Sequence, residues 1–156
     1  MDKKYVTIIS AVAVACVLVI VLTGFSNSKN ERIVENLIYQ RSDILQNMLL
    51  GKISIEEGED KLRDVELGNL YSDDIRNVYA YRNSDYDIVT EIKIISLNQS
   101  RNVSDVMNFE GEIEWTVSTN EGLEVLELSH NIGVKRTGDV LKLVSFEPVK
   151  DKNLPY

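Results

Sequence analysis

The chain contains one histidine, His130, and few other side chains of the kinds that carry out catalysis. The alternating pattern around His130 places it on the same strand face as Leu126 and Leu128, and Trp115 lies on the apolar face of the preceding predicted strand. The two rings are therefore candidates for the floor of a pocket. A histidine that acts as a general base needs an orienting carboxylate, and its own strand face supplies none. We predict no catalytic residue and keep a pocket at His130 and Trp115 as the alternative.

The sequence argues against a metal or cofactor site. One histidine cannot form a histidine cluster, and residues 26–156 contain no cysteine, which excludes a thiolate site in that part of the chain. Glu110, Glu112 and Glu114, here called the acidic ladder, lie on the polar face of one predicted strand. A strand spaces such carboxylates about 7 Å apart, whereas calcium needs about six to eight oxygen ligands. We expect a solvated face whose acids pair with a lysine across the sheet: Lys93, Lys135 or Lys142.

The stretch Tyr71–Tyr86 (YSDDIRNVYAYRNSDY) concentrates four of the seven tyrosines and includes two arginines. Tyrosine and arginine are enriched among the residues that dominate binding at protein interfaces. The alternative is that Tyr79 and a neighbour pack against the domain with their hydroxyls in water. The partner-docking hypothesis names five candidate residues: Tyr71, Arg76, Tyr81, Arg82 and Tyr86.

Composition limits the partners that this chain can have. The net charge is −8 over 156 residues, and residues 1–25 carry +1, so the remaining chain carries −9. Binding to nucleic acid demands clustered Lys and Arg, so we expect no nucleic acid partner. Without cysteine after residue 25 the domain cannot depend on disulfides, and roughly 130 residues suffice for one domain with its own core.

The run Tyr5–Phe25 (YVTIISAVAVACVLVIVLTGF) has no charge and no proline, and it supplies the ~20 apolar residues that a helix needs to cross a bilayer. Lys3 and Lys4 precede it, so the positive-inside rule predicts a single-pass anchor in the cell membrane with the N-terminus in the cytoplasm and the domain outside. Two alternatives are weaker. They are cleavage near Ser26 as a signal peptide, and lipidation of Cys16, after which the chain stays apolar instead of turning polar.

Ala11 and Ala15 form a small-xxx-small pair on one face of the predicted span. Such pairs let membrane helices approach closely, which would support a homo-oligomer. Alanine is also simply common in membrane spans, so self-association through this pair is the weaker expectation.

Helical patterns follow a short polar stalk at 26–30. They predict three helices: 31–50, 55–67 and 72–81. Gly51 stops the first, and Ser54 with Glu57 matches a capping box at the start of the second. Ser72 precedes two acids and is typical of a helix start.

The apolar period then changes from that of a helix to that of a strand. Four strands are predicted: 86–97, 107–118, 126–134 and 140–146. Gly111 in the second strand suggests a bend or the close approach of a helix. On the third strand we expect one inward face, made by Leu126, Leu128, His130, Ile132 and Val134. The domain thus covers 31–147, and residues 148–156 form a frayed tail.

This order predicts an α+β domain in which two or three helices cover one face of a four-stranded antiparallel meander. The architecture resembles the cone-shaped, cystatin-like α+β folds, in which a curved sheet wraps a helix, and the likeness covers most of residues 31–147. Small domains of that type occur behind a single N-terminal span in Gram-positive bacteria, including in conjugation and secretion machines. No motif accompanies the likeness, so it transfers no functional residue to this chain.

Two function classes follow from these observations. The favoured one is a non-enzymatic, membrane-tethered extracytoplasmic domain that binds membrane or envelope proteins in a bacterial cell-envelope assembly. The alternative is a small-ligand-binding or weakly catalytic pocket protein that uses His130. A cavity beside His130 with a second titratable group would favour the pocket protein, and a filled interior would favour the interaction domain.

Overall fold

The computed structural model describes residues 29–82, 88–100, 102–119 and 122–149. The chain divides into two compact units, Met1–Arg32 and Ile33–Tyr156, and the second holds the sheet and nearly all of the helical residues. Within the described residues no helix is both long enough and apolar enough to cross a bilayer. The predicted span at 5–25, with Ala11 and Ala15, lies outside those residues.

Three helices form close to the predicted positions: α2 (Lys29–Leu49), α3 (Ile55–Val65) and α4 (Asn69–Tyr81). In α2 the buried side chains recur every three or four residues from Val34 to Met48, as an amphipathic helix requires. Gly51 follows at a φ of +67°, a conformation that favours glycine and ends the helix. The Ser54 side chain accepts a hydrogen bond from the Glu57 N–H at 3.1 Å, which confirms the predicted cap of α3.

The start of the third helix was predicted wrongly. α4 begins at Asn69 and not at Ser72, directly after Gly68, whose φ is +65°. Leu70 is buried in the core, and its packing adds a turn before the polar residues that resemble a helix start. Asp74, expected in the first turn as a favourable acid, is instead buried deeper in the helix.

Gly58 lies where α3 approaches α2. A Cβ atom built on Gly58 would lie 2.3 Å from Sδ of Met48, whose side chain is fully buried. We expect Gly58→Ala to lower the free energy of unfolding by about 1–3 kcal/mol, because Met48 would have to move within a filled core. Urea unfolding measures this value. Intrinsic helix propensity alone predicts the opposite, a gain of about 1 kcal/mol, and that result would contradict the packing argument.

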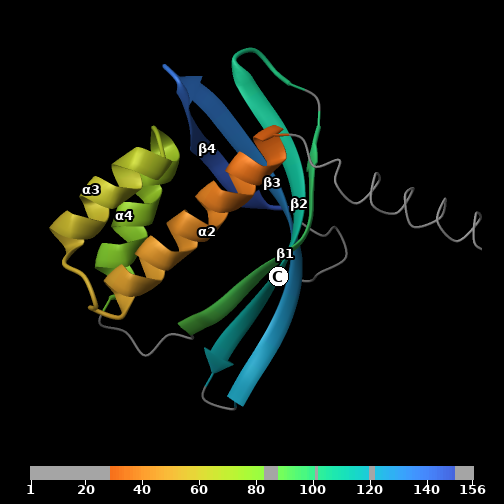
Figure 1. Ribbon diagram of the computed structural model, residues 1–156. Coiled ribbons are helices and arrows are strands. Elements are labelled where there is room, and N and C mark those ends of the chain that lie inside the picture. Colours follow the sequence, from red (N-terminus) through yellow and green to blue (C-terminus); the bar gives the residue numbers. More distant parts are fainter. Residues whose placement is uncertain (1–28, 83–87, 101, 120–121, 150–156) are drawn as a thin grey trace, which may run out of the picture. The chain divides into compact units, whose positions relative to one another are not determined.

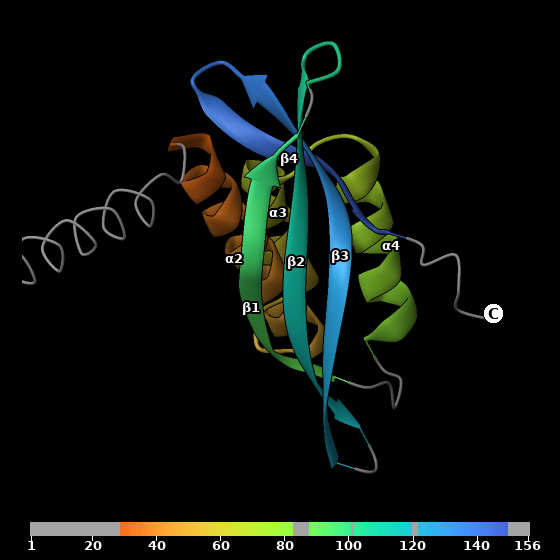
Figure 2. The same ribbon diagram turned by 90° about the vertical axis from the view of Figure 1, so that its right-hand side faces the viewer.

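Four strands form one antiparallel sheet in the order of the sequence. They are β1 (Ile88–Gln99), β2 (Val106–Thr119), β3 (Gly122–Thr137) and β4 (Val140–Pro148). Each pairs with its neighbour along the chain, which confirms the predicted meander. The three helices cover one side of the curved sheet, and the far end of the β2–β3 hairpin extends past them (Figures 1 and 2). The fold is therefore α+β, with three helices packed on a four-stranded antiparallel sheet.

The core lies between the helices and the inner face of the sheet. Phe109 and Ile113 of β2 are almost fully buried, as the alternation along this strand predicts. Gly111 lies between them, and a Cβ built on it would meet the side chains of Ile132 and Leu97 at 3.1 and 3.3 Å. The glycine therefore makes room for side chains of the two flanking strands, and the expected close approach of a helix is not what its nearest atoms show.

The inner face of β3 is only half covered. We expected five residues to share one buried face: Leu126, Leu128, His130, Ile132 and Val134. The last three are buried, but Leu126 and Leu128 are 44% and 41% exposed. Pairing with β4 ends at the His130–Pro148 pair, so among the described residues the first half of β3 has only β2 as a strand neighbour. The expectation failed for the two leucines because alternation tells which face a residue takes, and not whether another layer covers it.

Candidate functional site

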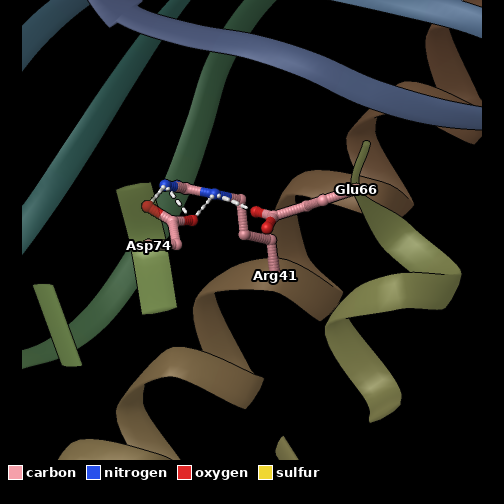
Figure 3. A network of polar contacts seen from close by, with 3 residues as sticks. All are labelled: Arg41, Glu66 and Asp74. Atoms are coloured by element: carbon pink, nitrogen blue, oxygen red, sulfur yellow. Dashed lines mark hydrogen bonds and ion pairs between the residues drawn. The ribbon is translucent and has the colours of Figure 1, made fainter. Parts of the chain in front are cut away.

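Three charged side chains meet in the interior beneath the helices (Figure 3). Arg41 comes from α2, Asp74 from α4, and Glu66 directly follows α3. Nε of Arg41 lies 2.6 Å from Oε1 of Glu66 and 2.8 Å from Oδ2 of Asp74, and Nη2 donates to Oδ1 of Asp74 at 2.8 Å. The side chains of Arg41, Glu66 and Asp74 are 11%, 0% and 8% exposed. These three residues, here called the Arg41 network, form a buried ionic cluster.

Sequence reasoning did not single out the Arg41 network, although a signal was present. Arg41 occupies the apolar stripe of α2, three residues after the buried Ile38. Asp74 lies on the buried stripe of α4 between Leu70 and Val78. A charged residue in the middle of an apolar helix stripe indicates a buried partner of opposite charge.

Glu66 retains a proton that an exposed carboxyl group would lose. Burial raises the pKa of Glu66 to about 8, and the hydrogen bond and charge of Asp74 act in the same direction, against the lowering effect of Arg41. At neutral pH Glu66 therefore holds its proton within the Arg41 network. A neutral Glu66 lowers the cost of burying the three ionisable groups together.

His130 packs among aromatic rings and is 4% exposed. Its ring centroid lies 4.7 Å from that of Phe146 and 5.7 Å from that of Trp115, and Nδ1 donates to the Leu128 carbonyl at 3.1 Å. Burial lowers the pKa of His130, the Leu128 hydrogen bond opposes this, and the charge of Arg41 lowers the pKa further. The ring is therefore neutral at pH 7 and carries its proton on Nδ1.

The structure brings His130 and Trp115 together, as the sequence predicted, but it does not add a catalytic partner. Cζ of Arg41 lies 4.7 Å from the centroid of Phe146, the ring against which His130 packs. Within the described residues the ion pairs of Glu66 run to Arg41, and no hydrogen bond joins a carboxylate to His130. His130 also lines a cavity of about 470 Å³ together with Glu110 and Glu112. Among the described residues neither carboxylate is hydrogen-bonded to the ring, so the cavity provides space for a ligand but no oriented acid–base pair.

The tyrosine-rich stretch is spread around α4. Tyr71 and Arg82 are half-buried, Arg76 and Tyr81 are exposed, and Tyr86 lies outside the described residues. A helix presents residues on one face only at spacings of three or four, and these residues do not keep that spacing throughout. Their role in partner contact stays a prediction.

The outer face of the sheet carries the acidic ladder. Nζ of Lys93 lies 3.6 Å from Glu114, which confirms one of the expected pairings. Lys135 pairs instead with Asp105 at 2.5 Å, and Lys142 donates to a main-chain carbonyl of α3. Among the residues that the structure describes, no group of three or more His, Cys, Asp or Glu side chains is arranged to hold a metal ion.

The first half of β3, residues 122–129, is an open strand edge. Four apolar side chains on it are exposed: Leu123, Val125, Leu126 and Leu128. In the described part of the chain, its main-chain contact on the side of β4 is one hydrogen bond, from the Val149 N–H to the Ser129 carbonyl at 2.8 Å. Unpaired strand backbone beside exposed apolar side chains is suited to contact with another chain. We call residues 122–129 the open edge.

The opposite edge of the sheet, β1, is protected. The Tyr39 hydroxyl of α2 accepts a hydrogen bond from the Ile94 N–H at 3.3 Å, and Gln46 of α2 donates to the Val89 carbonyl. Two register shifts interrupt β1, and the exposed Lys93 lies between them. Helix cover, bulges and charge are the ways in which proteins shield sheet edges. The open edge of β3 pairs with β2 without a register shift, and its apolar side chains remain exposed.

Comparison with known proteins finds relatives of the fold but not of the sequence. No family model and no curated protein matches the chain. The intermembrane space region of the chloroplast protein ARC6 gives a TM-score of 0.51 at 13% identity and covers 78% of this chain and 97% of its own. The β subunit of benzoate 1,2-dioxygenase from Burkholderia mallei gives 0.50 at 12% identity and covers 74% and 86%. The protein TraH from the Gram-positive conjugative plasmid pIP501 gives 0.43 at 11% identity and covers 74% and 96%.

At these identities the likeness shows the fold alone. It confirms an α+β domain in which helices pack on an antiparallel sheet. Of the structures named above, one with a TM-score of 0.50 is a subunit of an enzyme, and one with a TM-score of 0.51 is a region in an intermembrane space. The shared fold therefore does not decide between the two function classes, which have to be argued from the site.

Proposed function

We propose that the chain is a membrane-tethered extracytoplasmic interaction domain that acts without catalysis in a bacterial cell-envelope assembly. The observation that carries this proposal is the open edge. It presents four exposed apolar side chains on the part of β3 that has β2 as its one strand neighbour among the described residues. Exposed apolar surface next to unpaired backbone favours aggregation unless a partner covers it.

The interior supports an interaction role more than a catalytic one. The charges of the Arg41 network are paired with each other, and His130 is neutral and packed against Phe146. A general acid or base has to reach the reacting atoms of a substrate. These groups instead contact each other and the surrounding rings.

The apolar run supports the proposed membrane tether, and the net charge of the domain indicates the kind of partner. Residues 5–25 supply the tether in this proposal. A domain that carries −9 is repelled by anionic lipid headgroups, which favours a protein over the membrane surface as the partner of the domain.

Cross-linking of the full-length chain in cells, followed by mass spectrometry, tests the proposal. We expect capture of a reproducible set of membrane or envelope proteins. Replacing Leu126 and Leu128 together with serine should reduce this capture by about tenfold or more, because it removes apolar surface of two side chains that a partner would bury. Melting curves of the variant check that the domain still folds.

The matched control is the double variant Tyr81→Ala with Arg82→Ala. It alters the tyrosine-rich stretch, which is the alternative candidate for the docking surface. We expect it to leave capture unchanged. Loss of capture in this control, with none in the leucine variant, would move the interface to the tyrosine-rich stretch. Recovery of only unlinked or self-linked chain in the wild type would contradict the proposed function itself.

A pocket at His130 and Trp115 is the second candidate function. One observation favours it, because Nε1 of Trp115 is buried without a hydrogen-bond partner in the described structure. Such an N–H group could donate a hydrogen bond to an acceptor atom of a bound ligand. The interaction role is preferred because no carboxylate is joined to His130 among the described residues.

A further inference from the structure

We propose that the open edge binds an extended segment of a partner protein as an added antiparallel strand, with apolar side chains beside Leu126 and Leu128 on the inner face and a basic side chain beside Glu127 on the outer face. This inference rests on the proposed function and specifies its partner. Strand addition of this kind takes affinity from main-chain hydrogen bonds and specificity from alternate side chains.

The backbone of the open edge is oriented for such pairing. The Ser129 carbonyl accepts the Val149 N–H, so it points away from β2. Groups that point to one side of a strand recur at every second residue. The N–H and C=O groups of Glu127, Val125 and Leu123 therefore also point away from β2. A partner strand can pair with them in the way that β4 pairs with residues 130–137.

The side chains define the chemistry of the added strand. On the inner face the exposed Leu126 and Leu128 favour apolar neighbours. On the outer face Glu127 lies directly opposite Glu114 of β2, and Lys93 pairs with Glu114 from the other side. Like charges opposite each other destabilise a sheet. A Lys or Arg on the outer face of the added strand would lie beside Glu127 and offset this repulsion.

Two other segments that could pair with the open edge, residues 150–156 of the same chain and the open edge of a second copy, match these side chains less well. If residues 150–156 (KDKNLPY) continued the register of β4 along β3, Lys150 and Lys152 would fall on the apolar inner face and Asp151 beside Glu127. A second copy paired symmetrically through the same edge would bring the glutamates of both edges onto one outer face. A separate segment with apolar side chains beside Leu126 and Leu128 and a basic side chain beside Glu127 avoids both conflicts.

A labelled, end-capped peptide of alternating valine and lysine provides the direct test. The full-length chain in detergent micelles is titrated while peptide anisotropy is recorded. Emission from Trp115 gives a second signal, because it is the only tryptophan and lies opposite Leu126. We expect saturable binding with a change in Trp115 emission. Equal binding of a peptide with the same residues in two blocks, valines then lysines, would overturn the proposal, because charge alone would explain it.

Methylation of peptide nitrogens distinguishes pairing from general attraction. In the antiparallel register the lysine residues lie opposite Glu127 and Val125, so their amides face β3, whereas the valine amides face away. Methylation of the lysine amides should weaken binding by about tenfold or more, and methylation of the valine amides should have little effect. Equal tolerance of both, or the reverse pattern, would overturn antiparallel strand addition.

Variants of the chain make the same test from the other side. Val125→Pro removes an N–H that points away from β2 and should weaken peptide binding by about tenfold, whereas Val125→Thr, which keeps this N–H, should bind normally. If Val125→Pro does not fold, the methylated peptides still test whether the main chain of the open edge pairs with the added strand. Removal of residues 150–156 should leave affinity unchanged. A marked rise in affinity, or a dimer that the peptide dissociates, would overturn the proposal in favour of the tail or a second copy.

Failure of this inference can be told from failure of the proposed function. Capture of partners in cells that depends on Leu126 and Leu128, without peptide binding, would overturn strand addition and leave the interaction domain standing. Peptide binding at the open edge without any captured partner would support strand addition and overturn the proposed envelope role.

Discussion

Arg41→Met is expected to lower the free energy of unfolding by about 3–5 kcal/mol, because it leaves the buried Asp74 carboxylate without its partner. Asp74 is 8% exposed on its side chain and accepts two hydrogen bonds from the guanidinium. Methionine keeps much of the arginine's apolar volume, so the loss reports mainly on charge and not on a cavity. Urea unfolding at neutral pH measures the value.

Arg63→Met is the matched control for this experiment. Arg63 also has two carboxylate partners, Asp60 at 2.5 Å and Glu59 at 3.3 Å, but its side chain is 56% exposed. We expect it to cost less than about 1 kcal/mol. Adding Asp74→Leu to Arg41→Met should recover part of the loss, since the buried charge is then removed as well. Equal losses for Arg41→Met and Arg63→Met would show that the Arg41 network is not a buried, coupled cluster.

Glu66→Gln is expected to flatten the dependence of stability on pH. Folding raises the pKa of Glu66 from 4.5 to about 8, so between these values the folded chain holds a proton that the unfolded chain releases. The stability from this group is complete below pH 4.5 and is lost as pH rises through 8. Its slope is at most about 1.4 kcal/mol for each pH unit. Glutamine keeps the neutral shape of the protonated acid but has no proton to lose.

His130 contributes in the opposite direction and sets the window for this measurement. Burial lowers the pKa of His130 below 6.5, so its stabilising contribution is present above pH 6.5 and is lost as pH falls. The two slopes oppose each other below pH 6.5, and between 6.5 and 8 the slope from Glu66 remains. Melting temperatures in this window should fall with pH in the wild type and in His130→Gln, and stay nearly level in Glu66→Gln. A level wild-type curve would count against a protonated Glu66.

The elements of the fold could be predicted from the sequence wherever one side of each element is buried. The stripe from Val34 to Met48 predicts α2, and the alternation through Phe109 and Ile113 predicts β2. Residues that depend on a third element could not be predicted in this way. Whether Leu126 is covered depends on where β4 ends, and that is set by pairing far along the chain.

The candidate site could be predicted only in part. The pairing of strands brings His130 near Trp115, and the alternation of both strands already implied a shared face. The Arg41 network joins residues that lie 25 and 33 positions apart in sequence, so no local pattern specifies its partners. The open edge is defined by the absence of a neighbour among the described residues, and local pattern carries no information about neighbours.

The deeply buried part of β2 ends at Ile113, yet the strand and its partner continue to the hairpin end at Thr119 and Gly122. Because the pleat repeats every two residues, this hairpin can be lengthened or shortened in steps of two on each strand without turning a core side chain toward water. Exposed hairpin ends also tolerate insertion and deletion well. In lineages that carry this domain, the reach of the hairpin is thus a trait that selection can tune separately from the stability of the fold.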